Sequence, residues 1–224
     1  MDLANHDGAG LNRKPSGQCP TFSQSCFGAV DAVCLRQREL RAGRDPPTLR
    51  TPALLSSARL SLGAPLTGIR AKLQSGKGLT VVALGSSSTT GFGTGSGGAF
   101  PDVMKRELMR LRPSAQIELI NSGRIMDNIP GNVGRLGSDV LNHKPDLVVW
   151  QLGSNDAVWR GIAGNVKEMI TNAVKRLKAA NADIVLVDLQ YAPLVLASDR
   201  HVRMEKIIAE VAREQNVGLF PGSS

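Results

Sequence analysis

The sequence has few aromatic residues, no long hydrophobic run, and no cysteine beyond Cys34. Aromatic side chains make up 4% of the chain, whereas hydrophobic residues reach 42%, which is ordinary for a globular domain. No apolar run approaches the roughly 20 residues that a membrane-spanning helix needs. We therefore expect a globular protein without a membrane span.

The three cysteines, Cys19, Cys26 and Cys34, all lie near the N-terminus. Their number is odd, their spacing is not Cys-x-x-Cys, and the only histidine near them is His6, which argues against a metal site. The first residues also lack the basic-then-apolar pattern of a secretory signal. We expect a cytoplasmic location by default, with the periplasm or secretion as the alternative if the true start differs.

The formal net charge of +8 is spread along the whole chain. The sequence contains no run of Lys and Arg and no aromatic residues interleaved with a basic patch, which nucleic-acid-binding surfaces usually have. We therefore expect a solvated basic surface and no nucleic-acid partner. The oligomeric state stays open.

Residues 1–62 and residues 63–224 differ in pattern. The first range has no sustained hydrophobic period and predicts a poorly ordered N-terminal extension. The second alternates short β-branched runs with amphipathic stretches, which indicates a parallel sheet with helices on both faces. We expect strands at 80–84, 117–120, 146–152, 184–189 and 217–220, and helices at 66–74, 101–111, 129–141, 162–177 and 202–214.

Three polar loops directly follow three of the predicted strands. They are Gly85–Gly91 (GSSSTTG), Asn121–Gly123 (NSG) and Gly153–Asp156 (GSND). The carboxyl ends of parallel strands open on one edge of the sheet, where α/β proteins place their ligand sites. The loops offer a hydroxyl, a glycine amide and a side-chain amide, which are the parts of a nucleophile with an oxyanion hole.

A glycine-rich stretch, Gly93–Gly98, also fits the G-x-G-x-x-G pattern of dinucleotide-binding loops. A dinucleotide site needs the first glycine at the strand end, but here the strand ends near Gly85. No lysine follows in the register of a phosphate-binding loop either. We interpret this stretch as a plain glycine loop and expect no organic cofactor, although binding of a nicotinamide dinucleotide would reverse that interpretation.

The three loops resemble the sequence blocks of the SGNH hydrolases, also called GDSL esterases and lipases. In the first block Ser87 takes the place of the nucleophile, and Ser86 replaces the usual Asp, as in GSSS-type members. Asn121–Gly123 matches the Asn-x-Gly of the second block, and Gly153–Asp156 matches the Gly-x-Asn-Asp of the third. The resemblance spans roughly residues 65–220. It implies a three-layer α/β/α sandwich with a parallel, flavodoxin-like sheet of about five strands.

The resemblance also implies a chemistry, namely hydrolysis of a small-molecule carboxylic ester through an acyl-enzyme on Ser87, without metal or organic cofactor. Ser87 N–H, Gly123 N–H and the Asn155 side-chain amide would form the oxyanion hole, and Asp156 would hold its loop. Each position has a structural alternative. Ser87 or Asn155 could cap a helix, and Gly123 could serve only a turn.

The fourth block of that family, Asp-x-x-His, supplies the base and its orienting carboxylate, and it has no match here. We therefore expect a domain truncated at its C-terminus. His6 lies in the presumed extension, His143 precedes a strand on the wrong edge, and His201 follows the fourth strand and is the candidate for an unusual base. Two hypotheses stay open: a serine esterase with such a base, and a catalytically inactive hydrolase-like fragment or binding module.

Overall fold

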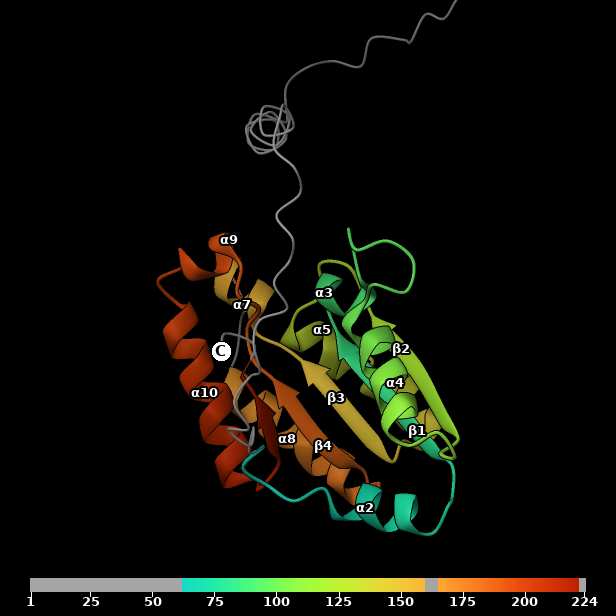
Figure 1. Ribbon diagram of the computed structural model, residues 1–224. Coiled ribbons are helices and arrows are strands. Elements are labelled where there is room, and N and C mark those ends of the chain that lie inside the picture. The colour runs from blue at the N-terminus through green and yellow to red at the C-terminus, as the bar shows by residue number, and fades with distance from the viewer. Residues whose placement is uncertain (1–61, 160–164, 222–224) are drawn as a thin grey trace, which may run out of the picture. The chain divides into compact units, whose positions relative to one another are not determined.

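The computed structural model describes residues 62–159 and 165–221 (Figure 1). The expected N-terminal extension, residues 1–62, lies outside the described residues except for Leu62, and so do the cysteines and His6. Leu62 packs against the core of the sheet, and its carbonyl oxygen accepts a hydrogen bond from Leu219 N–H at 2.8 Å. The folded region therefore includes Leu62.

The described residues form a five-stranded, all-parallel sheet in the order β2-β1-β3-β4-β5. This order is the flavodoxin-like one and confirms the predicted fold class. Ligand sites in such sheets lie at the carboxyl end where β1 and β3 meet, because the connections leave β1 in opposite directions. The strands are β1 (Leu79–Gly85), β2 (Ile117–Gly123), β3 (Leu147–Gln151), β4 (Asp183–Val187) and β5 (Gly218–Phe220).

Alternate strand residues pack on opposite faces of the sheet, as the pleat of a strand requires. Val82 and Leu84 join one core with α8 and α10, whereas Val81 joins the other with α2 and α4 (Figure 1). Every residue of β3 is buried, so the most hydrophobic predicted strand is central as expected. The three layers are therefore those of an α/β/α sandwich.

The longer helices are α2 (Thr67–Gln74), α4 (Phe100–Leu111), α8 (Val166–Ala179) and α10 (His201–Glu214), and the shorter ones are α3 (Ser87–Thr90), α5 (Ile129–Gly134), α6 (Leu136–Asp139), η2 (Leu141–His143), α7 (Ser154–Val158) and α9 (Pro193–Leu196). Figure 1 shows α3, α7 and α9 at the end of the sheet toward which the strand arrows point. In the part of the chain that the structure covers, no helix is long and apolar enough to cross a membrane.

The single helix expected over residues 129–141 is wrong. The chain forms α5, α6 and η2 there instead. Three glycines lower the helix propensity of this stretch. Arg135 lies between the first two helices with φ −102° and ψ 9°, and its side chain turns toward the strand ends. The break therefore presents an arginine to the carboxyl edge of the sheet.

Candidate active site

β1 passes into α3 through a tight turn at Gly85 and Ser86. A Cβ atom on Gly85 would lie 2.1 Å from Thr89 Oγ1 and 2.9 Å from the Gln151 carbonyl oxygen, so the turn requires glycine. Ser87 is half-buried and is the first residue of α3, while Ser86 is the N-cap. The hydroxyl of Ser87 forms no hydrogen bond with any described residue. The helix-capping alternative therefore does not account for Ser87.

A ring of uncharged hydrogen bonds holds the residues on both sides of this serine. Ser86 Oγ donates to Gln151 Oε1 at 3.1 Å, and Gln151 Nε2 donates to Ser154 Oγ at 3.1 Å. Ser154 Oγ also accepts from Gln190 N–H at 3.2 Å, and the side-chain oxygen of Gln190 accepts from Ser88 Oγ. These residues are the neutral ring, and they tie α3 to the loops after β3 and β4.

Gly123 ends β2 beside α3, and its N–H is already engaged. A Cβ atom there would lie 2.5 Å from Thr90 N and 2.9 Å from the Thr89 carbonyl carbon, so the close packing requires glycine. Gly123 N–H donates to Asn121 Oδ1 at 3.0 Å, and Asn121 Nδ2 donates to the Thr89 carbonyl oxygen at 2.8 Å. Gly123 therefore has a structural role in the turn, and an oxyanion would have to displace Asn121 Oδ1 to reach its N–H.

Met126 follows in the same loop with an unusual backbone conformation, φ 63°. Its side chain is exposed, and its N–H donates to no described residue. The carbonyl oxygen of the next residue, Asp127, accepts from Asn155 Nδ2 at 2.7 Å, which places this part of the loop beside the third polar loop. This backbone donor could not be predicted from the residue types, because methionine does not favour positive φ.

The third polar loop is fixed against the second. The N-cap of α7 is Gly153, at φ 93°, so Asn155 does not cap that helix and instead bonds Asp127. The buried carboxylate of Asp156 accepts from Ile129 N–H at 3.0 and 3.3 Å. Burial raises the pKa of Asp156 to about 6, although the hydrogen bond from Ile129 opposes the rise. These contacts suit the loop-holding part expected of Asp156.

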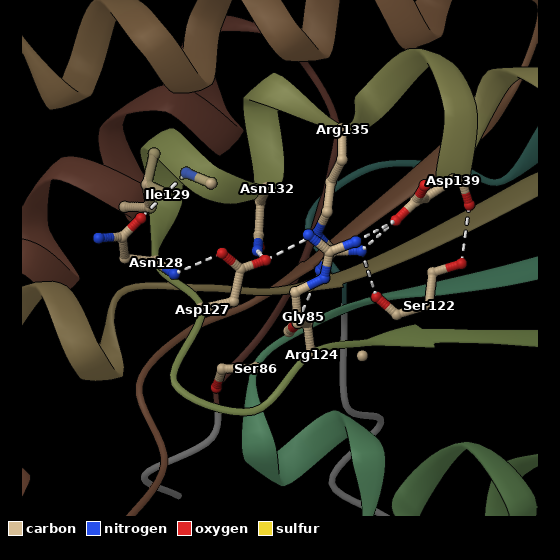
Figure 2. Close-up of polar contacts among 12 residues, drawn as sticks. Gly85, Ser86, Ser122, Arg124, Asp127, Asn128, Ile129, Asn132, Arg135 and Asp139 are labelled. Carbon is tan, nitrogen blue, oxygen red and sulfur yellow. Dashed lines mark hydrogen bonds and ion pairs between the residues drawn. The ribbon is translucent and has the colours of Figure 1, made fainter.

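Arg135 connects the ends of β1 and β2 (Figure 2). Its side chain is 7% exposed and lies between two carboxylates, with Nε 2.7 Å from Asp127 Oδ2 and Nη1 3.0 Å from Asp139 Oδ2. Nη1 also donates to the Ser122 carbonyl oxygen at 2.7 Å, and Nη2 donates to the Gly85 carbonyl oxygen at 3.0 Å. We call Arg135, Asp127 and Asp139 the guanidinium cluster.

The sequence profile of the non-GDSL lipase-like family matches residues 53–222. The chain belongs to this family. The membership confirms the resemblance to SGNH hydrolases that the three loops carry, and Ser86 stands where the GDSL motif has its Asp. No curated protein sequence matches the chain.

Solved structures of a lipolytic protein and of two esterases share the fold of this non-GDSL lipase-like chain. A protein assigned to the G-D-S-L lipolytic family from Desulfitobacterium hafniense DCB-2 is 22% identical, with a TM-score of 0.55 over 64% of this chain and 77% of that one. AlinE4, an SGNH-hydrolase family esterase, is 22% identical, with a TM-score of 0.54 over 64% and 75%. A two-domain esterase active on acetylated mannans is 19% identical, with a TM-score of 0.61 over 71% of this chain but 41% of its own. At these identities the likeness establishes the fold alone.

Neither of the two histidines that the structure describes, His143 and His201, forms a hydrogen bond with Ser87. His143 is exposed at the end of η2, ahead of β3, on the edge away from the polar loops, as expected. His201 is half-buried at the first position of α10, and its Nδ1 lies 3.2 Å from the Ser198 carbonyl oxygen. Within residues 62–159 and 165–221 there is also no group of His, Cys, Asp and Glu side chains that could hold a metal ion.

Proposed function

We propose that this chain is a serine ester hydrolase that acts on a small-molecule carboxylic ester through an acyl-enzyme on Ser87. The observation that carries the proposal is the setting of Ser87. Its hydroxyl has no hydrogen-bond partner among the described residues, yet it stands between two members of the neutral ring, on the edge where three polar loops meet. Membership of a lipase-like family supports the class of reaction.

In the proposed reaction Ser87 Oγ attacks the carbonyl carbon of the ester while its proton passes to a base. The alcohol then leaves with a proton from that base, and water hydrolyses the acyl-enzyme to release the acid. A serine hydroxyl is a weak nucleophile near pH 7, so a base must activate it. No metal or organic cofactor enters the proposal.

The oxyanion formed in each step needs fixed hydrogen-bond donors. The proposed donors are Ser87 N–H, which has no described acceptor, and the second hydrogen of Asn155 Nδ2, whose first hydrogen is already used. Gly123 N–H is the third proposed donor, provided that it exchanges Asn121 Oδ1 for the oxyanion. Met126 N–H is the alternative third donor, because it has no described acceptor to give up.

The proposed base is His201. If its Nδ1–H donates to the Ser198 carbonyl oxygen, Nε2 carries the lone pair that could accept a proton. His201 follows β4 in the chain and so lies on the connection that starts from the polar edge.

The alternative function is a catalytically inactive hydrolase-like binding module, since loss of a triad base leaves only a small residual rate.

Labelling of the full chain with a fluorophosphonate probe tests this proposal. We expect the parent to be labelled, Ser87→Ala to be unlabelled, and the exposed control Ser75→Ala to match the parent. His201→Ala should slow labelling at least about 100-fold, whereas His143→Ala should not. Labelling that persists in Ser87→Ala would overturn the assignment of Ser87 as the nucleophile. A folded parent protein that the probe does not label would favour the inactive binding module.

A further inference from the structure

We infer that Arg135 is the positioning residue of the oxyanion hole, acting on all three polar loops through one buried guanidinium group. The inference rests on the proposed function, because it concerns the same site. Figure 2 shows the guanidinium group at the ends of β1 and β2, with its three nitrogens directed at four different acceptors. Two of those acceptors, on Gly85 and Ser122, belong to the first and second polar loops, and a third belongs to Asp127, which is hydrogen-bonded to the third loop.

The most direct link runs through the peptide bond between Ser122 and Gly123. Arg135 Nη1 donates to the Ser122 carbonyl oxygen at 2.7 Å, and that oxygen belongs to the same planar unit as Gly123 N–H. Fixing the carbonyl therefore fixes the direction in which the N–H points. A positively charged donor also polarises the peptide, which strengthens its N–H as a hydrogen-bond donor.

The link to the nucleophile loop runs through Gly85. Its carbonyl oxygen accepts from Arg135 Nη2 at 3.0 Å and from Arg124 N–H at 3.0 Å. Gly85 is the last residue of β1, and the turn that follows it sets the start of α3. Arg135 thus fixes the point at which the chain turns toward Ser87 and its N–H.

The link to the third loop runs through Asp127. Its Oδ2 atom accepts from Arg135 Nε at 2.7 Å and from Asn132 Nδ2 at 2.6 Å. The carbonyl oxygen of the same residue accepts from Asn155 Nδ2 at 2.7 Å. By holding Asp127 from its carboxylate, Arg135 also sets the orientation of the Asn155 amide.

A lysine could not make these contacts. Arg135 uses a rigid planar fork in which Nε, Nη1 and Nη2 point in different directions, whereas a lysine ammonium is a single point of charge. Lysine would still neutralise part of the charge of Asp127 and Asp139. Arg135→Lys therefore separates the geometry of the fork from the charge that balances the two carboxylates.

The test measures kcat and KM for a small acyl ester, with Arg135→Lys compared with the matched control Arg124→Lys. Arg124 is close in sequence, but its side chain is exposed, and among the described residues its guanidinium group pairs only with Asp139, at 3.4 Å. We expect Arg135→Lys to lower kcat about 100-fold, as loss of an oxyanion donor does, with little change in KM. Arg124→Lys should stay within about 2-fold, because surface pairs contribute little.

Inhibition by a small boronic acid gives a second readout, because such an acid on Ser87 mimics the tetrahedral oxyanion. Its affinity should fall in Arg135→Lys in proportion to kcat, which a merely structural effect on folded fraction would not produce. If Arg135→Lys does not fold, Asp127→Asn keeps the size of the side chain and should lower kcat about 10-fold. Equal kcat in Arg135→Lys and Arg124→Lys would overturn the inference.

An inactive parent protein would count against the proposed function. The positioning role of Arg135 would then be tested by amide hydrogen exchange instead of kinetics. In that case the amide hydrogens of residues 86–90 and 123–126 should exchange faster in Arg135→Lys than in Arg124→Lys. Exchange that is equal in the two variants would overturn the inference independently of any activity. The two failures are therefore distinguishable.

Discussion

The two polar networks at the carboxyl edge of the sheet differ in charge. The neutral ring flanks Ser87 with hydroxyl and amide groups alone. The guanidinium cluster supports the loop after β2 with a buried cation between two carboxylates. The first network orders the residues around Ser87, the proposed nucleophile, without placing a net charge beside it. The second network makes directional hydrogen bonds at the high desolvation cost of buried ions.

This difference predicts how each network fails. Loss of one partner from a neutral hydrogen bond costs the desolvation of a polar group, about 1–3 kcal/mol. Loss of one partner from a buried ion pair leaves an uncompensated charge, which costs about 3–5 kcal/mol. The two networks should therefore respond unequally to substitutions of similar size.

The largest effect is expected from Arg135→Met. The methionine fills much of the arginine's volume but leaves Asp127, which is 9% exposed, without its cation, and it removes one donor from each of two carbonyl oxygens. We expect the free energy of unfolding to fall by about 3–5 kcal/mol, measured by urea denaturation. Arg124→Met is the control, because its exposed pair should contribute less than about 1 kcal/mol. Equal losses in the two variants would contradict the difference between the networks.

Arg135 could not be identified from the sequence. In a stretch expected to be one helix, Arg135 and Asp139 stand at i and i+4, the spacing of an ordinary surface pair. Its burial depends on the ends of β1 and β2, which are brought together only by the sheet. The glycines that break the helix were visible, but their consequence for Arg135 was not.

The strands and the three polar loops, in contrast, could be predicted, because hydrophobic runs that end in small polar residues are local patterns. The strand order and the assignment of Ser87 came from the resemblance to SGNH hydrolases, since a serine-rich loop alone does not specify a nucleophile. The position of Gln151, a polar residue at the end of the most hydrophobic strand, could have indicated a structural role. The role of Gln190 could not be predicted from the sequence, because it depends on where the loop after β4 packs.

An effect of intermediate size is expected from Asp156, whose contribution to the free energy of unfolding depends on pH. Burial raises the pKa of Asp156 to about 6, above the value of about 3.9 for an unfolded aspartate. The folded state therefore binds the proton more tightly, so stability should fall as pH rises from about 4 to 6, by roughly 2–3 kcal/mol. Asp156→Asn keeps an acceptor for Ile129 N–H and should lack this decline, as urea midpoints between pH 4.5 and 7.5 would show.

The pKa of Asp139, in the guanidinium cluster, shifts in the opposite direction to that of Asp156. Its titration therefore does not mask the change in stability expected between pH 4 and 6. The Ser138 hydroxyl and Arg135 hold the pKa of Asp139 below its ordinary value. Its contribution is present above the unfolded pKa and is lost only as pH falls through the lower folded value. A parent whose stability is flat between pH 4 and 6, or a decline that persists in Asp156→Asn, would contradict the assignment to Asp156.

The smallest effect is expected from Gln151→Leu in the neutral ring. Leucine leaves Ser86 Oγ without its acceptor and Ser154 Oγ without one of its two donors, which should cost about 1–3 kcal/mol. Because no member of the ring titrates between pH 5 and 8, we expect the same loss at both ends of that range. Adding Ser86→Ala removes the stranded hydroxyl, so the double variant should be no less stable than Gln151→Leu alone. Urea denaturation at pH 5 and pH 8 measures both expectations. If the loss in free energy of unfolding caused by Gln151→Leu differs between the two pH values, the ring is coupled to the charged groups beside it.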